Sequence, residues 1–543
     1  MRNRMDPCLT QGVAVSLPVW RAYSRAPIIP GYSAVSSITP IIEKFLGNPV
    51  SSEGQLQSDE LFAKVLEFEG SGSCVVETVG RKKRKAFCKV THLLDPVRTM
   101  QSYYSNAEKG ADRVNSKLRN PDNQAYVDCL ANYLLGQLRE RGLSPHFCLF
   151  YGGFKGVADI YRYDITSSYE SYRKYKGFWK KKNAGLFGLY VKNPDDAAIL
   201  DTPASSLRSS AFSYSSSSTE DTHISLESGD QNLSKQLVEL ESVGSFPSAE
   251  SDHGQEVESA SGSDYDSDDS DDESINVYSE FKNHPVMLIF QEEMVGVLDA
   301  LLEDPEETCH EDHWIAWTFQ VIAALCAAQG VLGLTHNDLH TNNIVYAETT
   351  ESWLFYTSRD GTVWRVPTYG RIFKIIDFGR AVFRVGETWF ITDDYGPGGD
   401  AEGQYNFGPL LTSKTKDDPV IYPNPSFDLC RYSVSIIDAL YPSMPAEKLD
   451  GDILSKEGGW TVHETESPLW NLLWSWLIDD DGRNILQDQD GSERFPDFDL
   501  YQHIATRISC AKPQDQLRKD IFKQFIVEAS SIGDWETKYP LFC

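Results

Sequence analysis

The stretch that decides the fold is LTHNDLHTNNI at residues 334–344, followed downstream by FKIIDFGRA at residues 373–381. Each stretch sets polar side chains beside a short apolar run. Asp338 is followed five positions later by the amide of Asn343, and the carboxylate of Asp377 comes directly after the apolar run FKII. The pattern predicts three polar side chains held at the ends of buried apolar elements.

These three side chains form a set with a recognisable chemical use. In phosphoryl transfer from Mg-ATP, one carboxylate accepts or orients the substrate hydroxyl proton, while an amide and a second carboxylate bind Mg²⁺. Asp338 fits the first role, and Asn343 and Asp377 carry the oxygen ligands that this hard ion prefers. Each residue alone could be a turn former, since Asp and Asn are common in turns. Their joint spacing favours the chemical interpretation.

The two stretches resemble the protein kinase superfamily. The first matches H-R-D-L-x-x-x-N with Asn337 in the Arg position, and the second contains D-F-G. Together with VPTYGR at residues 366–371, their wording resembles the divergent serine/threonine kinase-like proteins of large DNA viruses. The resemblance runs from about Leu61 to the C-terminus, apart from an acidic insertion. It implies an α+β, two-lobed protein-kinase-like fold with a small β-rich lobe and a larger, mainly helical lobe.

The composition limits the classes of partner. The chain has 543 residues, 41% of them hydrophobic, which is enough for more than one domain with a sizeable core. Its 50 Lys and Arg residues face 80 Asp and Glu residues, so the formal net charge is -30. This balance argues against binding to nucleic acid or to an anionic membrane surface, and we expect neither as a partner.

The cysteine pattern and the hydropathy bear on the compartment. The ten cysteines are scattered, without a C-x-x-C pair or zinc-ligand spacing, which favours a reduced, intracellular environment. The resemblance implies the cytoplasm, which for a viral protein means the host cytoplasm or the virion. No run approaches the roughly 18 to 20 apolar residues of a membrane span, so we expect a soluble protein.

Shifts in composition divide the chain into four parts. The Tyr- and Lys-rich residues 161–182 are expected to be a surface insertion, and the Ser/Asp run at 261–274 cannot bury enough apolar surface to offset its ordering entropy. Partners of this acidic segment are one possibility, and a solubilising role is the other. The parts are a loosely ordered N-terminal arm (1–52), the small lobe with its insertion (53–196), a disordered acidic insertion before the hinge strand (197–279), and the hinge with the large lobe (280–543).

A glycine-containing hairpin precedes a candidate phosphate-binding lysine. Gly70 and Gly72 lie in EGSGSCVVE, where backbone N–H groups could approach the ATP phosphates, although a simple turn explains these glycines equally well. After a basic turn, AFCK at residues 86–89 resembles the V-A-I-K strand, and this resemblance assigns the α- and β-phosphates to Lys89. Lys85 is the alternative.

An acid on the next long helix should orient that lysine. Apolar residues recur with helical spacing over residues 122–141, which predicts a helix with one buried face. Asp128 is the inward acid expected on this helix, and Glu108 in a more polar segment is the alternative. A solvated helix acid would explain Asp128 equally well.

The strand PVMLIFQEEM at residues 285–294 resembles the segment that joins the two lobes. In the family the backbone of this hinge bonds the adenine edge, so the resemblance implies four nucleotide-binding residues. They are Gln291, Glu292, Glu293 and Met294. The strongly apolar stretch at 314–332 is expected to form the buried helix that leads into the loop at 334–344.

Other loop residues carry expectations about packing and regulation. By resemblance, His336 packs under Asp377 and its neighbour, and Asp428 tethers the loop backbone from a buried helix. Asn337 replaces the Arg that contacts a phosphorylated activation loop, so that form of activation is not expected. His340 replaces the usual Lys and resembles the aminoglycoside and choline kinases, which leaves the substrate class open.

The sequence therefore predicts an ATP-dependent serine/threonine protein kinase that uses Mg²⁺, with Mn²⁺ as the alternative ion. Its partner would be a protein substrate. Two alternatives stay open. One is a pseudokinase or scaffold, favoured by the incomplete glycine loop and the missing A-P-E motif, whose acidic segment recruits partners. The other is a small-molecule kinase, favoured by His340.

Overall fold

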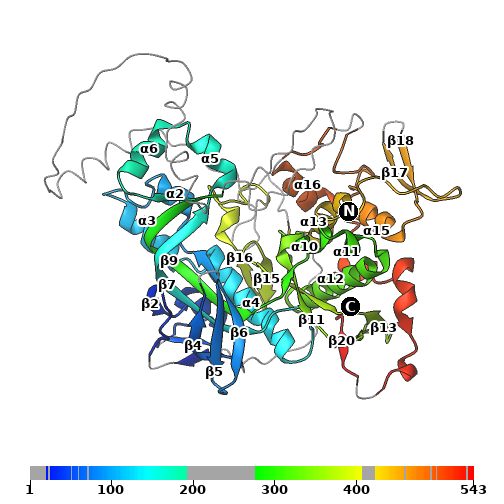
Figure 1. The fold of residues 1–543 in the computed structure, drawn as a ribbon, viewed down its shortest axis with the longest axis horizontal. Coiled ribbons are helices and arrows are strands. Elements are labelled where there is room, and N and C mark those ends of the chain that lie inside the picture. Colours follow the sequence, from blue (N-terminus) through cyan, green and yellow to red (C-terminus); the bar gives the residue numbers. More distant parts are fainter. Residues whose placement is uncertain are drawn as a thin grey trace, which may run out of the picture.

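The structure is a computed structural model, and it describes most of the chain. The described residues are 20–22, 25–50, 52–58, 60–69, 72–191, 276–405, 422–457, 460–488, 492–496, 498–533 and 536–543. They form a mixed α/β fold. A large sheet lies on one side of the molecule, and several helices gather on the other side (Figure 1).

A seven-stranded sheet dominates the first side. Its strand order is β2-β7-β9-β6-β5-β4, and β8 pairs with β9. Alternate residues of β5 are buried, as expected for a strand with one face on the core. The strands are β2 (Tyr32–Ser36), β4 (Phe62–Phe68), β5 (Ser73–Thr78), β6 (Lys83–His92), β7 (Phe150–Asp164), β8 (Gly188–Val191) and β9 (Val277–Glu292). Because β9 begins at Val277, the last residues of the insertion predicted to be disordered over 197–279 belong to a strand. The rest of the acidic insertion lies outside the described residues.

Helix α4 (Gln124–Glu140) packs along this sheet and confirms the helix predicted over 122–141. The Asn123 side chain caps it by accepting a hydrogen bond from the Ala125 N–H at 3.1 Å. Almost the whole helix is buried, since α1 (Thr39–Leu46) covers a further face and β7 and β9 lie beneath it. Two short helices precede it, α2 (Pro96–Met100) and α3 (Gly110–Arg119).

The N-terminal residues are more ordered than the sequence analysis expects. β2 pairs with β7 at the sheet edge, and α1 (Thr39–Leu46) buries Ile41 and Ile42 completely. β1 (Trp20–Ala22) pairs with β3 (Gly54–Leu56). The prediction of a loosely ordered arm failed because the partners of these elements lie far away in the sequence. Residues 1–19 lie outside the described part.

The Tyr- and Lys-rich segment is not a mere surface insertion. β7 continues through it to Asp164, and α5 (Thr166–Tyr172) and α6 (Lys176–Asn183) follow. Phe178 is fully buried in an aromatic cluster with Tyr169 and Tyr172, while Lys176 and Lys180 of α6 are exposed. The aromatic residues form a small core of their own, and the lysines around them gave the segment its polar appearance.

The helical side is built on α12 (Glu311–Leu332), which is buried along nearly all of its length. By length and composition α12 could cross a membrane, so the expectation that no run is long enough was wrong. However, 83% of its most apolar 18-residue window is buried inside the protein, which makes it weak evidence for a span. The other helices are α10 (Asp299–Leu302), α11 (Pro305–Thr308), α13 (Phe427–Val434), α14 (Ile437–Leu440), α15 (Pro468–Trp476), α16 (Asp499–Arg507) and α17 (Pro513–Gln516).

The remaining strands form small sheets, several of which contact α12. β12 and β13 form a hairpin, pairing antiparallel across a turn in which Gly361 has a φ of +86°. The sheets are β10 (Gly296–Val297), β11 (Ile344–Glu348) and β14 (Arg371–Ile375); β19 (Ile526–Val527), β13 (Val363–Pro367), β12 (Trp353–Thr357) and β20 (Lys538–Pro540); β15 (Val382–Val385) and β16 (Thr388–Ile391); and β17 (Ile453–Glu457) and β18 (Trp460–His463). Of these, β11 and β14 position the candidate site.

Candidate functional site

The loop at residues 334–344 runs from the end of α12 into β11. Gly333 ends the helix in the left-handed conformation, with a φ of +56°. Thr335 then pairs with Val382 through backbone hydrogen bonds of 2.9 Å in both directions. A short 3-10 turn over Thr341–Asn343 closes the loop. The loop is therefore fixed at both ends, and most of its residues are buried.

Asp428, on α13, fastens the middle of this loop. Its two carboxylate oxygens accept hydrogen bonds from the backbone N–H groups of His336 and Asn337, each at 2.9 Å. Burial raises the pKa of the Asp428 carboxyl, although these bonds oppose the rise. The His336 ring packs 5.3 Å from the ring of Phe378, and its Nε2 lies 2.8 Å from the Ile376 carbonyl oxygen. The Asp428 tether and the packing of His336 against Phe378 were expected from the sequence.

Asn337 ties the loop to the segment after β14. Its side-chain amide donates to the carbonyl oxygens of Thr335 and Arg380, each at 3.1 Å, and its own carbonyl accepts from the Tyr405 hydroxyl. Asn337 is fully buried and has a φ of +66°, a conformation that Asn tolerates better than most residues. In this structure Asn337 acts as a local clamp.

Lys89, Asp128 and Asp377 meet at one point. The Lys89 ammonium nitrogen lies 2.7 Å from Asp128 Oδ2 and 2.7 Å from Asp377 Oδ1. Burial lowers the pKa of Lys89, but the two carboxylates outweigh it and hold that pKa above its usual range. Burial likewise raises the pKa of Asp377, yet the Lys89 charge brings it well below the ordinary value. Lys89 and Asp377 are therefore both charged at neutral pH.

Asp128 joins this cluster to the backbone of the D-F-G stretch. Its Oδ1 accepts from the Phe378 N–H at 2.8 Å, and the Asn132 amide donates to the same oxygen at 2.8 Å. Burial raises its pKa, and the Lys89 charge only partly offsets the rise. Asp128 is thus the helix acid that pairs with Lys89. The alternatives, Lys85 and Glu108, are both exposed.

The register of β11 and β14 brings Asn343 next to Asp377. Ile344 lies opposite Ile375, and the Ile376 N–H donates to the Asn343 carbonyl oxygen at 3.0 Å. Asp377 follows with a φ of +62°, a backbone conformation that side-chain-bearing residues rarely adopt. Strain of this kind persists where neighbouring contacts hold it, and it is frequent at functional sites.

The orientation of the Asn343 side chain bears on metal binding. Its amide nitrogen donates to the Asp338 carbonyl oxygen at 2.9 Å and lies 3.1 Å from His340 Nε2. Since the nitrogen is engaged, the carbonyl oxygen is left for an ion. The described residues contain no group of three or more His, Cys, Asp or Glu side chains that could hold a metal. Mg²⁺ commonly binds through one or two carboxylates together with substrate phosphates, so Asn343 and Asp377 fit that ion.

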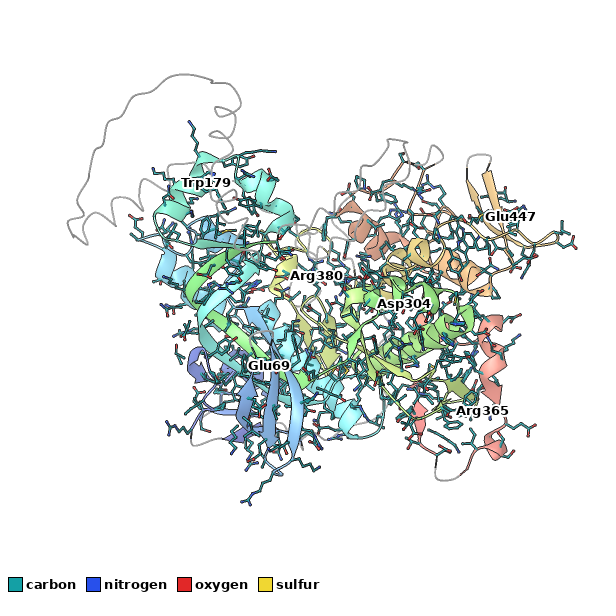
Figure 2. All side chains as sticks on the ribbon, in the orientation of Figure 1. Glu69, Trp179, Asp304, Arg365, Arg380 and Glu447 are labelled. Atoms are coloured by element: carbon teal, nitrogen blue, oxygen red, sulfur yellow. The ribbon has the colours of Figure 1, made fainter. Side chains whose placement is uncertain are left out.

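Asp338 is enclosed by residues that the sequence analysis did not identify. The Tyr501 hydroxyl of α16 donates to Asp338 Oδ1 at 2.8 Å, and Arg380 Nη1 lies 3.6 Å from the same oxygen. Burial raises the pKa of Asp338, but the charges of Arg380 and His340 hold it below its ordinary value. Figure 2 shows Arg380 near the centre of the molecule, between the sheet side and the helical side. No motif marks Tyr501, since it lies 163 residues after Asp338.

The glycine turn lies over β6. Gly72 has a φ of +95°, and a Cβ there would come 3.0 Å from the Cys88 carbonyl oxygen, so the turn requires glycine for close packing. The neighbouring Ser73 hydroxyl donates to the carboxylate of Glu293, which connects this turn with the end of β9. Gly70 lies outside the described residues.

The predicted hinge residues follow the end of β9. Gln291 and Glu292 close the strand, and the Glu292 N–H bonds the Leu149 carbonyl oxygen at 2.9 Å. Glu293 and Met294 continue without strand pairing and are partly buried. In the described part of the chain, the Gln291 side-chain oxygen is buried without a hydrogen-bond partner.

A separate cavity of about 220 Å³ lies beside the start of α4, and neither Lys89 nor Asp338 lines it. Its wall includes Lys117, Asp393 and Asp394. Burial, with the charge of nearby Asp400, raises the pKa of Asp394 to about 8. We treat this cavity as distinct from the cluster around Lys89.

Comparison with known proteins adds no assignment. No family model matches the chain, and no curated protein matches it either. A functional interpretation therefore depends on the residues and their geometry.

Proposed function

We propose that the protein is an ATP- and Mg²⁺-dependent phosphotransferase, and specifically a divergent serine/threonine protein kinase. The observation that carries the proposal is the position of Lys89, whose ammonium lies 2.7 Å from both Asp128 and Asp377. A lysine oriented by a helix acid, beside a carboxylate that follows a strand, is the arrangement that kinases use to bind the phosphates and the metal of Mg-ATP.

The proposed roles follow from the charges of the side chains in the site and from the oxygen atoms that could bind a metal ion. Lys89 would bind the α- and β-phosphates, and Asp128 would orient it. Asn343 and Asp377 would hold Mg²⁺, which when bound neutralises phosphate charge. Asp338, whose depressed pKa leaves it ionised at neutral pH, would orient the substrate hydroxyl and accept its proton.

The same proposal assigns a lobe of a kinase-like fold to each side of the molecule. The seven-stranded sheet with α4 would be the small lobe of a kinase-like fold, and the part built on α12 would be the large lobe. The end of β9, from Gln291 to Met294, would connect them and bond the adenine edge. The close tie between Ser73 and Glu293 supports a nucleotide site enclosed between the glycine turn and this connection.

A specific observation favours a second candidate, a scaffold without phosphotransfer activity. Tyr501 and Arg380 both approach Oδ1 of Asp338, so this carboxylate oxygen is already engaged within the chain. A small-molecule acceptor, suggested by His340, would use the same chemistry as a protein acceptor. The two acceptor classes differ only in the product formed.

Mass spectrometry and labelled ATP test the proposal. The wild-type protein, Asp377→Ala and the control Asp360→Ala would each be incubated with Mg-ATP, alone and with dephosphorylated casein. Asp360 lies on the exposed turn between β12 and β13. We expect phosphate on the wild type or on casein, an equal amount with the control, and a loss of about 10² to 10³-fold with Asp377→Ala. Equal transfer by the wild type and Asp377→Ala would contradict the proposal, and no transfer by any of them would favour the scaffold.

A further inference from the structure

The contact between Tyr501 and Asp338 is made by two distant parts of the chain. The Tyr501 hydroxyl donates to Asp338 Oδ1 at 2.8 Å, and Arg431 Nε of α13 donates to the Tyr501 oxygen at 2.9 Å. Arg431 therefore occupies a lone pair of the phenol oxygen and directs its proton towards the carboxylate. A raised pKa of about 12, caused mainly by burial, keeps that proton on Tyr501 at neutral pH.

Packing holds the Tyr501 ring in this position. The ring stacks on Phe498 with centroids 5.3 Å apart, and it meets Phe427 of α13 at 5.9 Å. The guanidinium groups of Arg380 and Arg431 lie 5.8 Å and 5.3 Å from the ring centroid. Such aromatic and cation–π contacts hold the ring in place. Because they are non-covalent, a movement of α16 would break them reversibly.

Asp338 Oδ1 has little capacity left for another donor. Tyr501 and Arg380 approach the same oxygen, and the Asp338 side chain is only 13% exposed. A substrate hydroxyl that passes its proton to Asp338 needs the same kind of contact, an O–H donor within hydrogen-bond distance of this carboxylate. Tyr501 already supplies such a hydroxyl from within the chain.

We propose that Tyr501 takes the place at Asp338 that a substrate hydroxyl requires, so that α16 keeps the acceptor side of the site closed until it withdraws. This inference rests on the proposed phosphotransfer function and adds a regulation to it. Withdrawal exchanges one O–H···O hydrogen bond for another and breaks no covalent bond. A nucleotide could bind at Lys89 in either state, since among the described residues Tyr501 forms no hydrogen bond with Lys89, Asp128 or Asp377.

Tyr501→Phe tests the proposal because it removes the hydroxyl and keeps the ring. We expect kcat/KM for dephosphorylated casein to rise about tenfold, the size of a lost hydrogen bond to a charged group, with the KM for ATP unchanged. Tyr432→Phe is the matched control, since it removes a buried hydroxyl of α13 that bonds Thr318 at 3.1 Å. The control should show no rise. Unchanged or lower activity of Tyr501→Phe would mean that Tyr501 only supports Asp338, and would overturn the proposal.

Hydrogen exchange of the wild-type protein gives a measurement that does not depend on any variant folding. Amides of α16 should exchange faster with casein and a non-hydrolysable ATP analogue than with the analogue alone. Equal exchange under both conditions would overturn the capping role. The failure of the proposed function looks different: neither the wild type nor Tyr501→Phe would then transfer phosphate to casein or to itself. A wild type that transfers phosphate, beside a Tyr501→Phe variant that is no faster, would overturn the capping alone.

Discussion

The surroundings of Lys89 and of Asp338 are both clusters of charged side chains, but they differ in how far solvent or a ligand can reach them. At Lys89, a cation lies between two carboxylates, and the Asp377 side chain remains 44% exposed. At Asp338, a carboxylate lies among Arg380 and Tyr501, and its side chain is 13% exposed. A charged cluster can therefore be ready for a ligand or closed to one, according to whether a distant element covers it.

The largest expected effect would separate the two regions. Asp338→Asn should reduce phosphate transfer by about 10² to 10⁴-fold, because an amide cannot accept the hydroxyl proton. Binding of Mg-ATP should change little, since Lys89 and Asp377 keep their contacts. Labelled-phosphate transfer and calorimetric ATP binding would measure the two quantities, with Asp360→Asn as a surface control. A matching loss of ATP affinity would show that the regions are not separable.

Asp128→Asn tests the Lys89 region alone. The amide oxygen can still accept a hydrogen bond from the Phe378 N–H, but the negative charge that pairs with Lys89 is lost. We therefore expect phosphate transfer to fall about 10- to 100-fold through weaker Mg-ATP binding. Asp122→Asn is the control, because Asp122 forms an ion pair with Lys44 just before α4. Hydrogen exchange of α16 should be unaffected in both variants. Faster exchange of α16 in Asp128→Asn would indicate that the two regions are coupled.

A separate expected effect, on stability and not on activity, concerns Asp394, whose buried carboxyl lies near Arg380. Its pKa of about 8 exceeds the ordinary value, so the folded state binds more protons than the unfolded state between about pH 4 and pH 8. Stability from this group is therefore present at low pH and is lost as pH rises through that window. The loss is at most about 1.4 kcal/mol for each pH unit.

Asp394→Asn should remove this dependence. The variant should gain stability relative to the wild type as pH rises from about 5 to 8, and the difference should level off above pH 8. Urea unfolding at a series of pH values would measure it. Parallel stability profiles would show that the pKa of Asp394 is not raised in the folded protein.

Local patterns were enough to predict several elements and contacts. Helical spacing of apolar residues predicted α4, and the strongly apolar stretch at 314–332 predicted the buried helix α12. The contacts of Asp428 with the loop backbone were also foreseen, because motif wording carries information about packing. These successes share one reason: the signal lies within a short stretch of sequence.

Other features could not be predicted because their partners are remote. The edge strand β2 is defined by β7, more than a hundred residues away, and the aromatic cluster around Phe178 is hidden among surface lysines. Likewise, α12 contains a window apolar enough to cross a membrane, and only its burial shows that it lies in a core. Composition shows how apolar a segment is, but the elements packed against the segment decide whether it is buried or exposed.

The sequence by itself determined which polar side chains are available and how they are spaced, because Asp338, Asn343 and Asp377 follow fixed intervals around apolar runs. Only the tertiary structure decided that Lys89 lies between Asp128 and Asp377, and that Tyr501 covers Asp338. The physical reason is that ion pairs and hydrogen bonds depend on distances of about 3 Å, which only packing sets between residues remote in the chain.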